Sequence, residues 1–177
     1  MNSKVKKITL LSVATTILVI VSPISFYIGL IPISLSLLIL FIISSIFSLK
    51  DSLIILGIYL ILGLTGLPVF AGYKNIYEAF SSGTIGYIIG YIPCIILSSL
   101  IVNINKHKII FYILSCFIGT IICYIFGVIF YMILFKTSLS YTIIITVLPF
   151  IIFYIIKIFI SSITSFYINK NIQKGSI

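Results

Sequence analysis

The sequence predicts an all-α membrane protein with six transmembrane helices in a single domain that covers residues 1–177. Of its 177 residues, 62% are hydrophobic and only 7% are charged. Soluble domains carry about 25% charged residues, because their surface must be compatible with water on every side. The composition therefore excludes a soluble domain and predicts that the chain is surrounded by a lipid bilayer.

Polar breaks divide the chain into apolar runs of about the length that a helix needs to cross a hydrocarbon core of ~30 Å. The predicted spans are residues 8–28, 31–47, 53–70, 84–102, 109–135 and 149–168. The first run follows Lys4, Lys6 and Lys7, as in a signal peptide, but it exceeds the ~7–15 apolar residues of such a peptide. We expect it to be retained as the first transmembrane helix.

The last apolar run is too long for one straight span, and it contains Pro149. Proline lacks an N–H and clashes with the preceding turn, so it opposes a continuous helix but is tolerated in a first turn. We therefore expect a short surface element at residues 139–148, followed by a sixth span that begins at Pro149.

The distribution of Lys predicts the orientation. The chain has eleven Lys, no Arg and two acidic residues, and with six spans eight Lys flank one side of the membrane and two flank the other. Cytoplasmic flanks are enriched in Lys and Arg, so both termini are expected to be cytoplasmic. The Lys are scattered singly or in pairs, which does not favour a phosphate-binding patch for nucleic acid.

Lys157 belongs to neither side, because it lies inside the sixth predicted span, ~12 Å below the outer boundary. A Lys at the bilayer centre is unfavourable by ~2.5–3.5 kcal/mol and usually faces an internal cavity. Helical spacing places Tyr154, Ser161 and Ser165 on the same face. No intramembrane carboxylate is available, so we expect an anionic ligand. The alternative is a Lys that snorkels to the interface while the Ser face packs inward.

A second concentration of unusual residues lies between two Gly-rich ends, at residues 66–90. Gly66 and Pro68 predict an irregular backbone near the outer end of the third span, which protein or a water-filled cavity must cover. The loop that follows is long enough to act as a lid. The candidate lid residues are Tyr73, Lys74, Asn75, Tyr77 and Glu78. Its aromatic side chains, with that of Phe80, are bulky enough to close over a ligand.

The fourth predicted span carries Gly83, Gly86 and Gly90 along one side, and Tyr87 and Tyr91 along a neighbouring side. This spacing fits the wall of a binding site. It fits equally well a close helix contact of the GxxxG kind with aromatic residues at the membrane interface. The spacing alone leaves both interpretations open.

Ser12 and Thr16 lie four residues apart on one face of the first predicted helix. Small residues permit two helices to approach closely. This face is therefore a candidate contact with a partner helix, and a contact within the chain is the alternative.

No catalytic or metal site and no cofactor are predicted. The three Cys lie inside apolar runs, without a CxxC motif or an accompanying His or carboxylate, which indicates small buried hydrophobic residues. The single histidine, His107, lies between two Lys in a loop, and no acid–base pair falls within the membrane. The chain also lacks a GxxxxGK[ST] motif, so it is not expected to hydrolyse ATP.

The motif GLPVFAG at residues 66–72, followed by SGTIGYIIGY at residues 82–91, resembles the GLPVFAGG and GPTGGYLLGF signatures of the BioY family. This family comprises the biotin-specific S components of energy-coupling factor (ECF) transporters. Upstream, YLILG at residues 59–63 resembles its YLLLG, and PISL at residues 32–35 resembles its PITLQ. Downstream, LPFIIFYIIK at residues 148–157 resembles a pattern of the kind PFLPGDLLK, which places Lys157 on the family's Lys.

The resemblance implies an S-component-like bundle with an outer lid loop in a bacterial cell membrane. It implies biotin as the ligand, and a transmembrane T component with two ATPase subunits as partners. With the spacing arguments, it assigns substrate binding to Lys157, Tyr154, Tyr87, Gly86, Phe70 and Ser36. Tyr154 stands where the family pattern has Asp, and Ser36 where it has Gln. A different small anionic vitamin-like substrate and a ligand-free structural membrane protein remain the alternatives.

Overall fold

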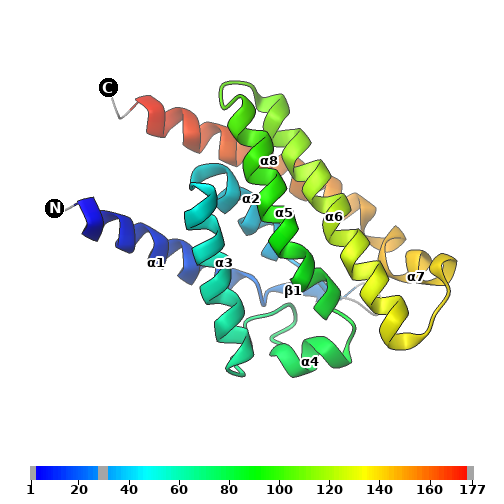
Figure 1. Cartoon of the computed structure of the whole chain (residues 1–177). Coiled ribbons are helices and arrows are strands. Elements are labelled where there is room, and N and C mark those ends of the chain that lie inside the picture. Colours follow the sequence, from blue (N-terminus) through cyan, green and yellow to red (C-terminus); the bar gives the residue numbers. More distant parts are fainter. Residues whose placement is uncertain (1–2, 28–31, 175–177) are drawn as a thin grey trace.

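The computed structural model describes residues 3–27 and 32–174, and this part of the chain is mainly helical (Figure 1). The elements, in chain order, are α1 (Ser3–Val21), β1 (Ser25–Tyr27), β2 (Pro32–Ser34), α2 (Ser36–Ile46), α3 (Leu49–Leu64), α4 (Ile76–Ser81), α5 (Ile85–Ile104), α6 (Ile109–Phe135), α7 (Leu139–Thr146), the short 3-10 helix η1 (Leu148–Phe150) and α8 (Ile151–Lys174). The predicted helical class is therefore confirmed.

Three helical segments among the described residues are long and apolar enough to cross a membrane: Ile85–Ile104, Ile109–Phe135 and Leu139–Ile172. Helix α2 is apolar but has only 11 residues. At 1.5 Å per residue it is about 17 Å long, well short of a ~30 Å hydrocarbon core. The membrane class is thus supported, and the number of six spans stays a prediction.

The first two predicted spans differ most from the structure. Helix α1 ends at Val21 and α2 begins at Ser36, and the antiparallel pair β1–β2 lies between them in the register Ser25↔Ser34 and Phe26↔Ile33. The predicted boundaries at residues 28 and 31 lie outside the described residues. Pro23 and Pro32 explain the change, because neither can continue an α-helix through its interior.

The later boundaries agree more closely with the sequence. Helix α3 ends before Gly66, which has a φ of +96°, so the irregular backbone expected there is present. The fifth predicted span coincides with α6. The short element expected before the sixth span is α7, and Pro149 lies in η1 immediately before α8.

Helices α5 and α6 run antiparallel, joined by a short loop, and lie against each other (Figure 1). Glycines make this contact possible. A Cβ at Gly86 would lie 2.6 Å from the carbonyl oxygen of Phe126, and a Cβ at Gly90 would lie 3.1 Å from the Cα of Cys123. The glycine side of the fourth predicted span is therefore a helix-packing face.

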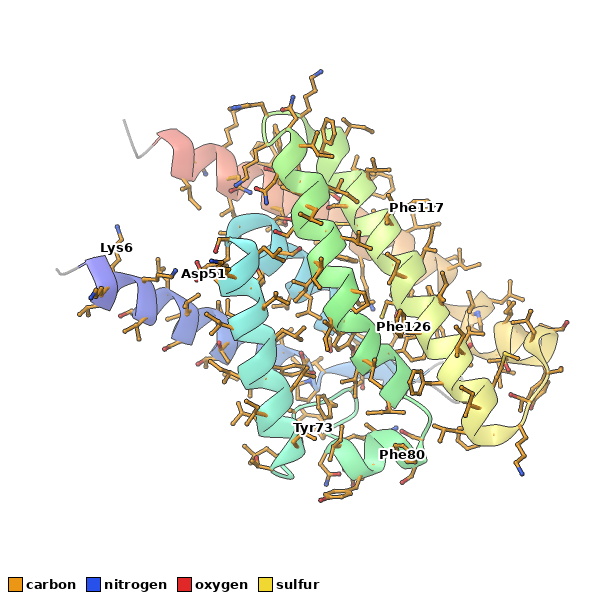
Figure 2. All side chains as sticks on the ribbon, in the orientation of Figure 1. Lys6, Asp51, Tyr73, Phe80, Phe117 and Phe126 are labelled. Carbon is orange, nitrogen blue, oxygen red and sulfur yellow. The ribbon has the colours of Figure 1, made fainter. Side chains whose placement is uncertain are left out.

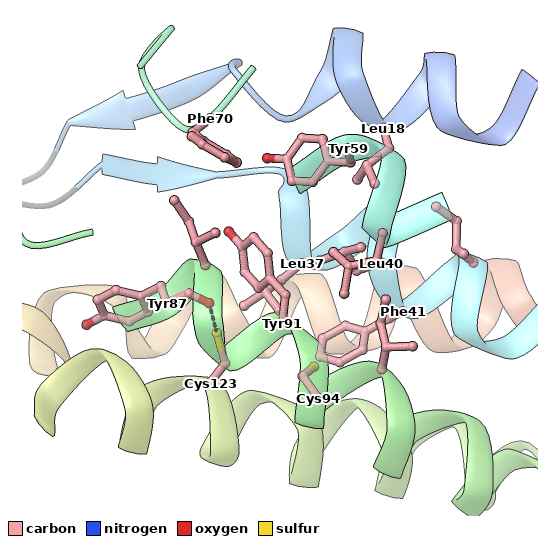
Figure 3. Packing of buried hydrophobic residues seen from close by; sticks show 14 of the residues in the cluster. Leu18, Leu37, Leu40, Phe41, Tyr59, Phe70, Tyr87, Tyr91, Cys94 and Cys123 are labelled. Carbon is pink, nitrogen blue, oxygen red and sulfur yellow. Dashed lines mark hydrogen bonds between the residues drawn. The ribbon is translucent and has the colours of Figure 1, made fainter. Parts of the chain in front are cut away.

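The interior is formed mainly by side chains from α2, α3, α5 and α6, together with Leu18 of α1 and Phe70 from the segment after α3 (Figure 3). The three Cys are buried free thiols. At the Lys-rich end, Lys7 Nζ lies 2.7 Å from Asp51 Oδ1, which joins α1 to the start of α3. Hydrogen bonds from Lys7 and Ser48 lower the pKa of the Asp51 carboxyl from its usual value.

Candidate ligand-binding site

A small cavity lies between the β1–β2 hairpin, the first turns of α5, the middle of α6 and the junction of η1 with α8. Its polar lining includes Ser34, Thr84, Thr146 and the tyrosines Tyr87, Tyr91 and Tyr154. Its volume of about 30 Å³ accommodates one or two water molecules. Ligand pockets typically enclose ~300–1,000 Å³, so a vitamin-sized molecule enters only if the surrounding groups move.

Three tyrosines form an aromatic wall beside this cavity. The ring of Tyr124 lies between those of Tyr87 and Tyr154, with centroid distances of 6.0 and 4.8 Å, and both pairs meet edge to face. Tyr87 donates its hydroxyl hydrogen bond to the Thr146 carbonyl at 3.2 Å. That bond ties α5 to the end of α7 and fixes the orientation of the Tyr87 ring.

Lys157 is buried next to the cavity, with 5% of its surface exposed. Its ammonium donates a 2.6 Å hydrogen bond to the Ser34 carbonyl on β2 and lies 4.5 Å from the centroid of the Tyr154 ring. Ser34 and Tyr154 both line the cavity, so the two groups that contact the ammonium separate it from the cavity. Among the described residues, Lys157 makes no ion pair.

The two acidic side chains of the protein are engaged elsewhere. Asp51 pairs with Lys7, and Glu78 caps α4 by accepting a hydrogen bond from the Asn75 N–H at 2.9 Å. The field of Lys157 is therefore balanced by a carbonyl dipole and an aromatic face rather than by a carboxylate. A buried cation in this setting attracts an anionic ligand group.

The structure brings Lys157, Tyr154 and Tyr87 together, as the sequence predicts. Ser36 lies directly behind the cavity wall, where its oxygen accepts a 2.8 Å hydrogen bond from the hydroxyl of Ser34. The other two predicted contacts lie elsewhere. Gly86 faces α6, and Phe70 packs edge to face on Tyr59 with a centroid distance of 5.4 Å. Neither lines the cavity.

The predicted lid is a structured segment rather than a simple loop. Helix α4 begins at Asn75, whose side chain accepts the Glu78 N–H at 3.1 Å and completes a capping box. The side chains of Tyr73, Tyr77 and Phe80 are 66%, 72% and 56% exposed. Figure 2 shows Tyr73 and Phe80 on the outside of this end of the molecule. Their rings do not lie over the cavity in this structure, and the aromatic closure over a ligand expected from the sequence stays a prediction.

The residues that do cover the cavity come just before this segment. Ala71 lines the cavity, and the Gly72 N–H donates to the Pro23 carbonyl at 3.0 Å. Gly72 has a φ of +76°, which favours glycine. Phe70 and Lys74 exchange backbone hydrogen bonds of 2.9 and 3.3 Å and close the turn. We call residues 70–72, of which Ala71 lines the cavity, the cover, and the turn that holds them leads directly into α4.

Ser12 and Thr16 both have exposed side chains, and the Thr16 hydroxyl donates to the Ser12 carbonyl at 2.9 Å. The opposite face of α1 is buried through Ala14, Thr15 and Leu18. The pair therefore faces away from the rest of the chain, on a surface that lipid or another helix can cover.

Sequence reasoning missed Ser34 and Thr146 as cavity residues. Ser34 belongs to a hairpin that the apolar pattern did not reveal. Thr146 follows Tyr87 by 59 positions, and nothing local indicates that their backbone and hydroxyl groups meet. The available signal that Thr146 faces inward was its four-residue spacing from Thr142, which places two polar side chains on one side of a mostly apolar short helix. Both are fully buried in the structure.

The architecture matches a fold that is known from a solved structure. It matches the solved S-component for biotin from an ECF-type ABC transporter with a TM-score of 0.82, covering 96% of this chain and 93% of that chain at 23% identity. The chain thus has the fold of that S-component.

The sequence comparison then gives the family. Residues 1–174 match the BioY family, and the chain belongs to it. It is also 25% identical over 91 residues to the biotin transporter BioY2 of Lactococcus lactis subsp. cremoris (strain MG1363), across 51% of this chain. The matched region covers 50% of the relative, so the chain spans about half of the length of that protein. The family predicted from the GLPVFAG and SGTIGYIIGY motifs is therefore confirmed.

Proposed function

We propose that the protein is the substrate-binding S component of an ECF-type uptake transporter and that its substrate is biotin. The observation that carries the proposal is the buried Lys157 beside a tyrosine-lined cavity, in a chain that matches the BioY family from residue 1 to residue 174. A lysine without a carboxylate partner suits the carboxylate of biotin. Tyrosine hydroxyls and the Thr146 backbone suit the polar ureido ring.

Binding requires an exchange of partners at Lys157. In the present structure, the ammonium is held by the Ser34 carbonyl and the cavity measures about 30 Å³. A ligand carboxylate replaces the carbonyl as the acceptor and displaces the β1–β2 hairpin or the cover at residues 70–72. The ligand thereby rearranges the same segments that control its access to the cavity.

Equilibrium binding of labelled biotin to the purified protein tests this function directly. Saturable binding at or below micromolar biotin is expected, and unlabelled biotin should compete. An absence of binding at that concentration contradicts the biotin assignment. A different small anionic vitamin-like substrate is the second candidate, because Tyr154 stands where the family pattern has Asp and offers a hydroxyl instead of a carboxylate acceptor.

The proposed partners are a transmembrane T component and two ATPase subunits, which supply the energy that this chain cannot obtain from ATP. The exposed pair Ser12 and Thr16 on α1 is the proposed contact with the T component. Co-purification of these subunits from membranes supports the transporter over a ligand-free structural membrane protein.

We predict that α4 faces the outside of a bacterial cell and that the α5–α6 loop faces the cytoplasm with both termini. The two regions lie at opposite ends of the molecule (Figure 1), and the eight-to-two distribution of Lys supports this direction. In a variant without the native Cys, Asn75→Cys should react with a membrane-impermeant thiol reagent in intact cells, whereas Asn105→Cys should not. Preferential labelling at position 105 would show that the topology is the reverse of the predicted one.

We also predict that replacing residues 73–80 by a Gly-Ser loop accelerates ligand release without loss of expression. The replacement removes α4 and the backbone pairing of Phe70 with Lys74, which hold the cover at residues 70–72 in place. Phe80→Ser is the matched control, because this exposed ring is not part of the cavity and its loss should leave the dissociation rate unchanged. An unaltered dissociation rate in the loop variant would show that residues 73–80 only connect α3 to α5 and do not retain the ligand.

A further inference from the structure

A second concave site lies at the Lys-rich end of the molecule, between the α5–α6 loop and the last turns of α8. It has a volume of about 150 Å³ and is lined by Lys106, His107, Phe166 and Lys170. Figure 1 shows this end of the bundle opposite α4 and the proposed cover. The site is thus separate from the cavity beside Lys157.

The charge of this site is not balanced by acidic side chains. Lys108 follows directly in the loop, so three Lys lie at or next to the concavity. The chain has two acidic residues. Asp51 is paired with Lys7, and Glu78 lies in α4 at the other end of the molecule. In the described part of the chain, no ion pair involves Lys106, Lys108 or Lys170.

Polar contacts of different burial hold the backbone around the site. The Tyr112 hydroxyl donates to the Lys106 carbonyl at 3.1 Å, and the His107 N–H donates to Asn105 Oδ1 at 3.0 Å. On α8, the buried Asn169 donates to the Ser45 carbonyl at 2.8 Å. The neighbouring Phe166 ring packs edge to face on Tyr112 with a centroid distance of 5.7 Å. The lysines therefore project from an ordered wall, not from a loose loop.

An apolar surface leads along the helix to this site. Phe159, Ile163 and Tyr167 of α8 are exposed and follow one another at intervals of four residues, with Lys170 three residues further on. Side chains at such intervals lie on one side of a helix. In a membrane-spanning helix, this side meets the acyl chains of lipids, and the basic site lies where those chains end in headgroups.

We propose that this site binds the phosphate headgroup of an anionic phospholipid, with its acyl chains along the exposed face of α8. Lysines near a membrane surface attract anionic lipids, and basic pockets between transmembrane helices hold such headgroups. The Phe166 wall and the apolar surface below it favour a lipid over a free phosphate ion. A second basic groove contains Lys6 and Lys7, but Asp51 also lines it and pairs with Lys7, so it offers less net charge.

Native mass spectrometry of the purified full chain with an equal mixture of phosphatidylglycerol and phosphatidylcholine of identical acyl chains tests the site. Phosphatidylglycerol should be retained preferentially. The double variant Lys106→Gln/Lys170→Gln should bind it roughly 30-fold less tightly, as expected for two lysines at a membrane surface. The double variant Lys6→Gln/Lys136→Gln removes the same charge elsewhere and should retain it. Equal loss in both variants, no preference in the unmodified protein, or equally tight binding of inorganic phosphate overturns the proposal.

A second measurement keeps all eleven Lys and does not depend on folding of the double variant. The chain contains no Trp, so Phe166→Trp introduces a single fluorophore into the wall of the site. Phosphatidylglycerol with brominated acyl chains should quench this fluorophore more strongly than brominated phosphatidylcholine at the same mole fraction. Phe117→Trp, on an exposed part of α6, is the reference for lipid contact without the basic site. Equal quenching by both lipids at position 166 overturns the proposal.

Discussion

Replacing Lys157 with Met is expected to weaken binding of the anionic substrate by roughly 10- to 150-fold, because a charge-assisted hydrogen bond contributes about 1.5–3 kcal/mol. Methionine keeps an unbranched apolar stem of similar length, so the packing on Tyr154 changes little. The lost contribution is that of the ammonium group, which in the present structure lies 2.6 Å from the Ser34 carbonyl. Isothermal titration with biotin measures the change in affinity.

Biotin amide separates a carboxylate contact from a general disturbance of the site. If Lys157 holds the carboxylate, Lys157→Met penalises biotin far more than the amide. An equal loss of affinity for both ligands would show that the ammonium contacts a part of the ligand other than the carboxylate. Lys136→Met, at the α6–α7 turn away from the cavity, is the matched control and should leave both affinities unchanged.

The same variant also affects the free protein. Without the ammonium, the Ser34 carbonyl loses its hydrogen bond from α8, and the tie between the β1–β2 hairpin and α8 disappears. Two opposing effects follow, because removal of a buried charge is favourable in the membrane while an unsatisfied carbonyl is unfavourable. The Lys157→Met substitution should therefore change the free energy of unfolding by less than it changes the free energy of biotin binding.

The sequence could predict the buried cation but not its partner. Lys157 interrupts an apolar run, and its spacing from Tyr154 is local, so both could be recognised without a structure. The acceptor, Ser34, lies 123 positions away on a hairpin of three-residue strands. Such short strands leave almost no alternating pattern, and within an apolar stretch they cannot be distinguished from a helix. Pro23 and Pro32 were the available signals that the helix stops.

The orientation of side chains was the other limit of the sequence. Gly86 and Gly90 fitted a ligand wall and a helix contact equally well, and only the position of α6 decides between them. The lid rings are a similar case. The pattern of Tyr77 and Phe80 showed that the segment is aromatic, but the capping box that begins α4 at Asn75 turns both side chains outward. Packing against distant elements determines these orientations, and local spacing does not contain that information.

Gly86→Ala is expected to lower the stability of the folded protein by about 1–3 kcal/mol, the usual range for an added group in a well-packed core. Its Cβ would lie 2.6 Å from the Phe126 carbonyl oxygen and 2.6 Å from the Cβ of Phe130. Neither atom can move away by rotation of a side chain, so α5 and α6 must separate. The shift also displaces Tyr87, so a weaker affinity for biotin should accompany the loss of stability.

Gly57→Ala is the matched control, since this helical glycine in α3 has no atom within 4 Å of the position where a Cβ would lie. Alanine is favoured over glycine in a helix, so the control should be as stable as the unmodified protein or more stable. Thermal unfolding in detergent, followed by circular dichroism, compares the two variants under one condition. Equal unfolding temperatures for Gly86→Ala and Gly57→Ala contradict the role of Gly86 in helix packing. If Gly86→Ala instead weakens biotin binding at unchanged stability, Gly86 contacts the ligand after the cavity opens.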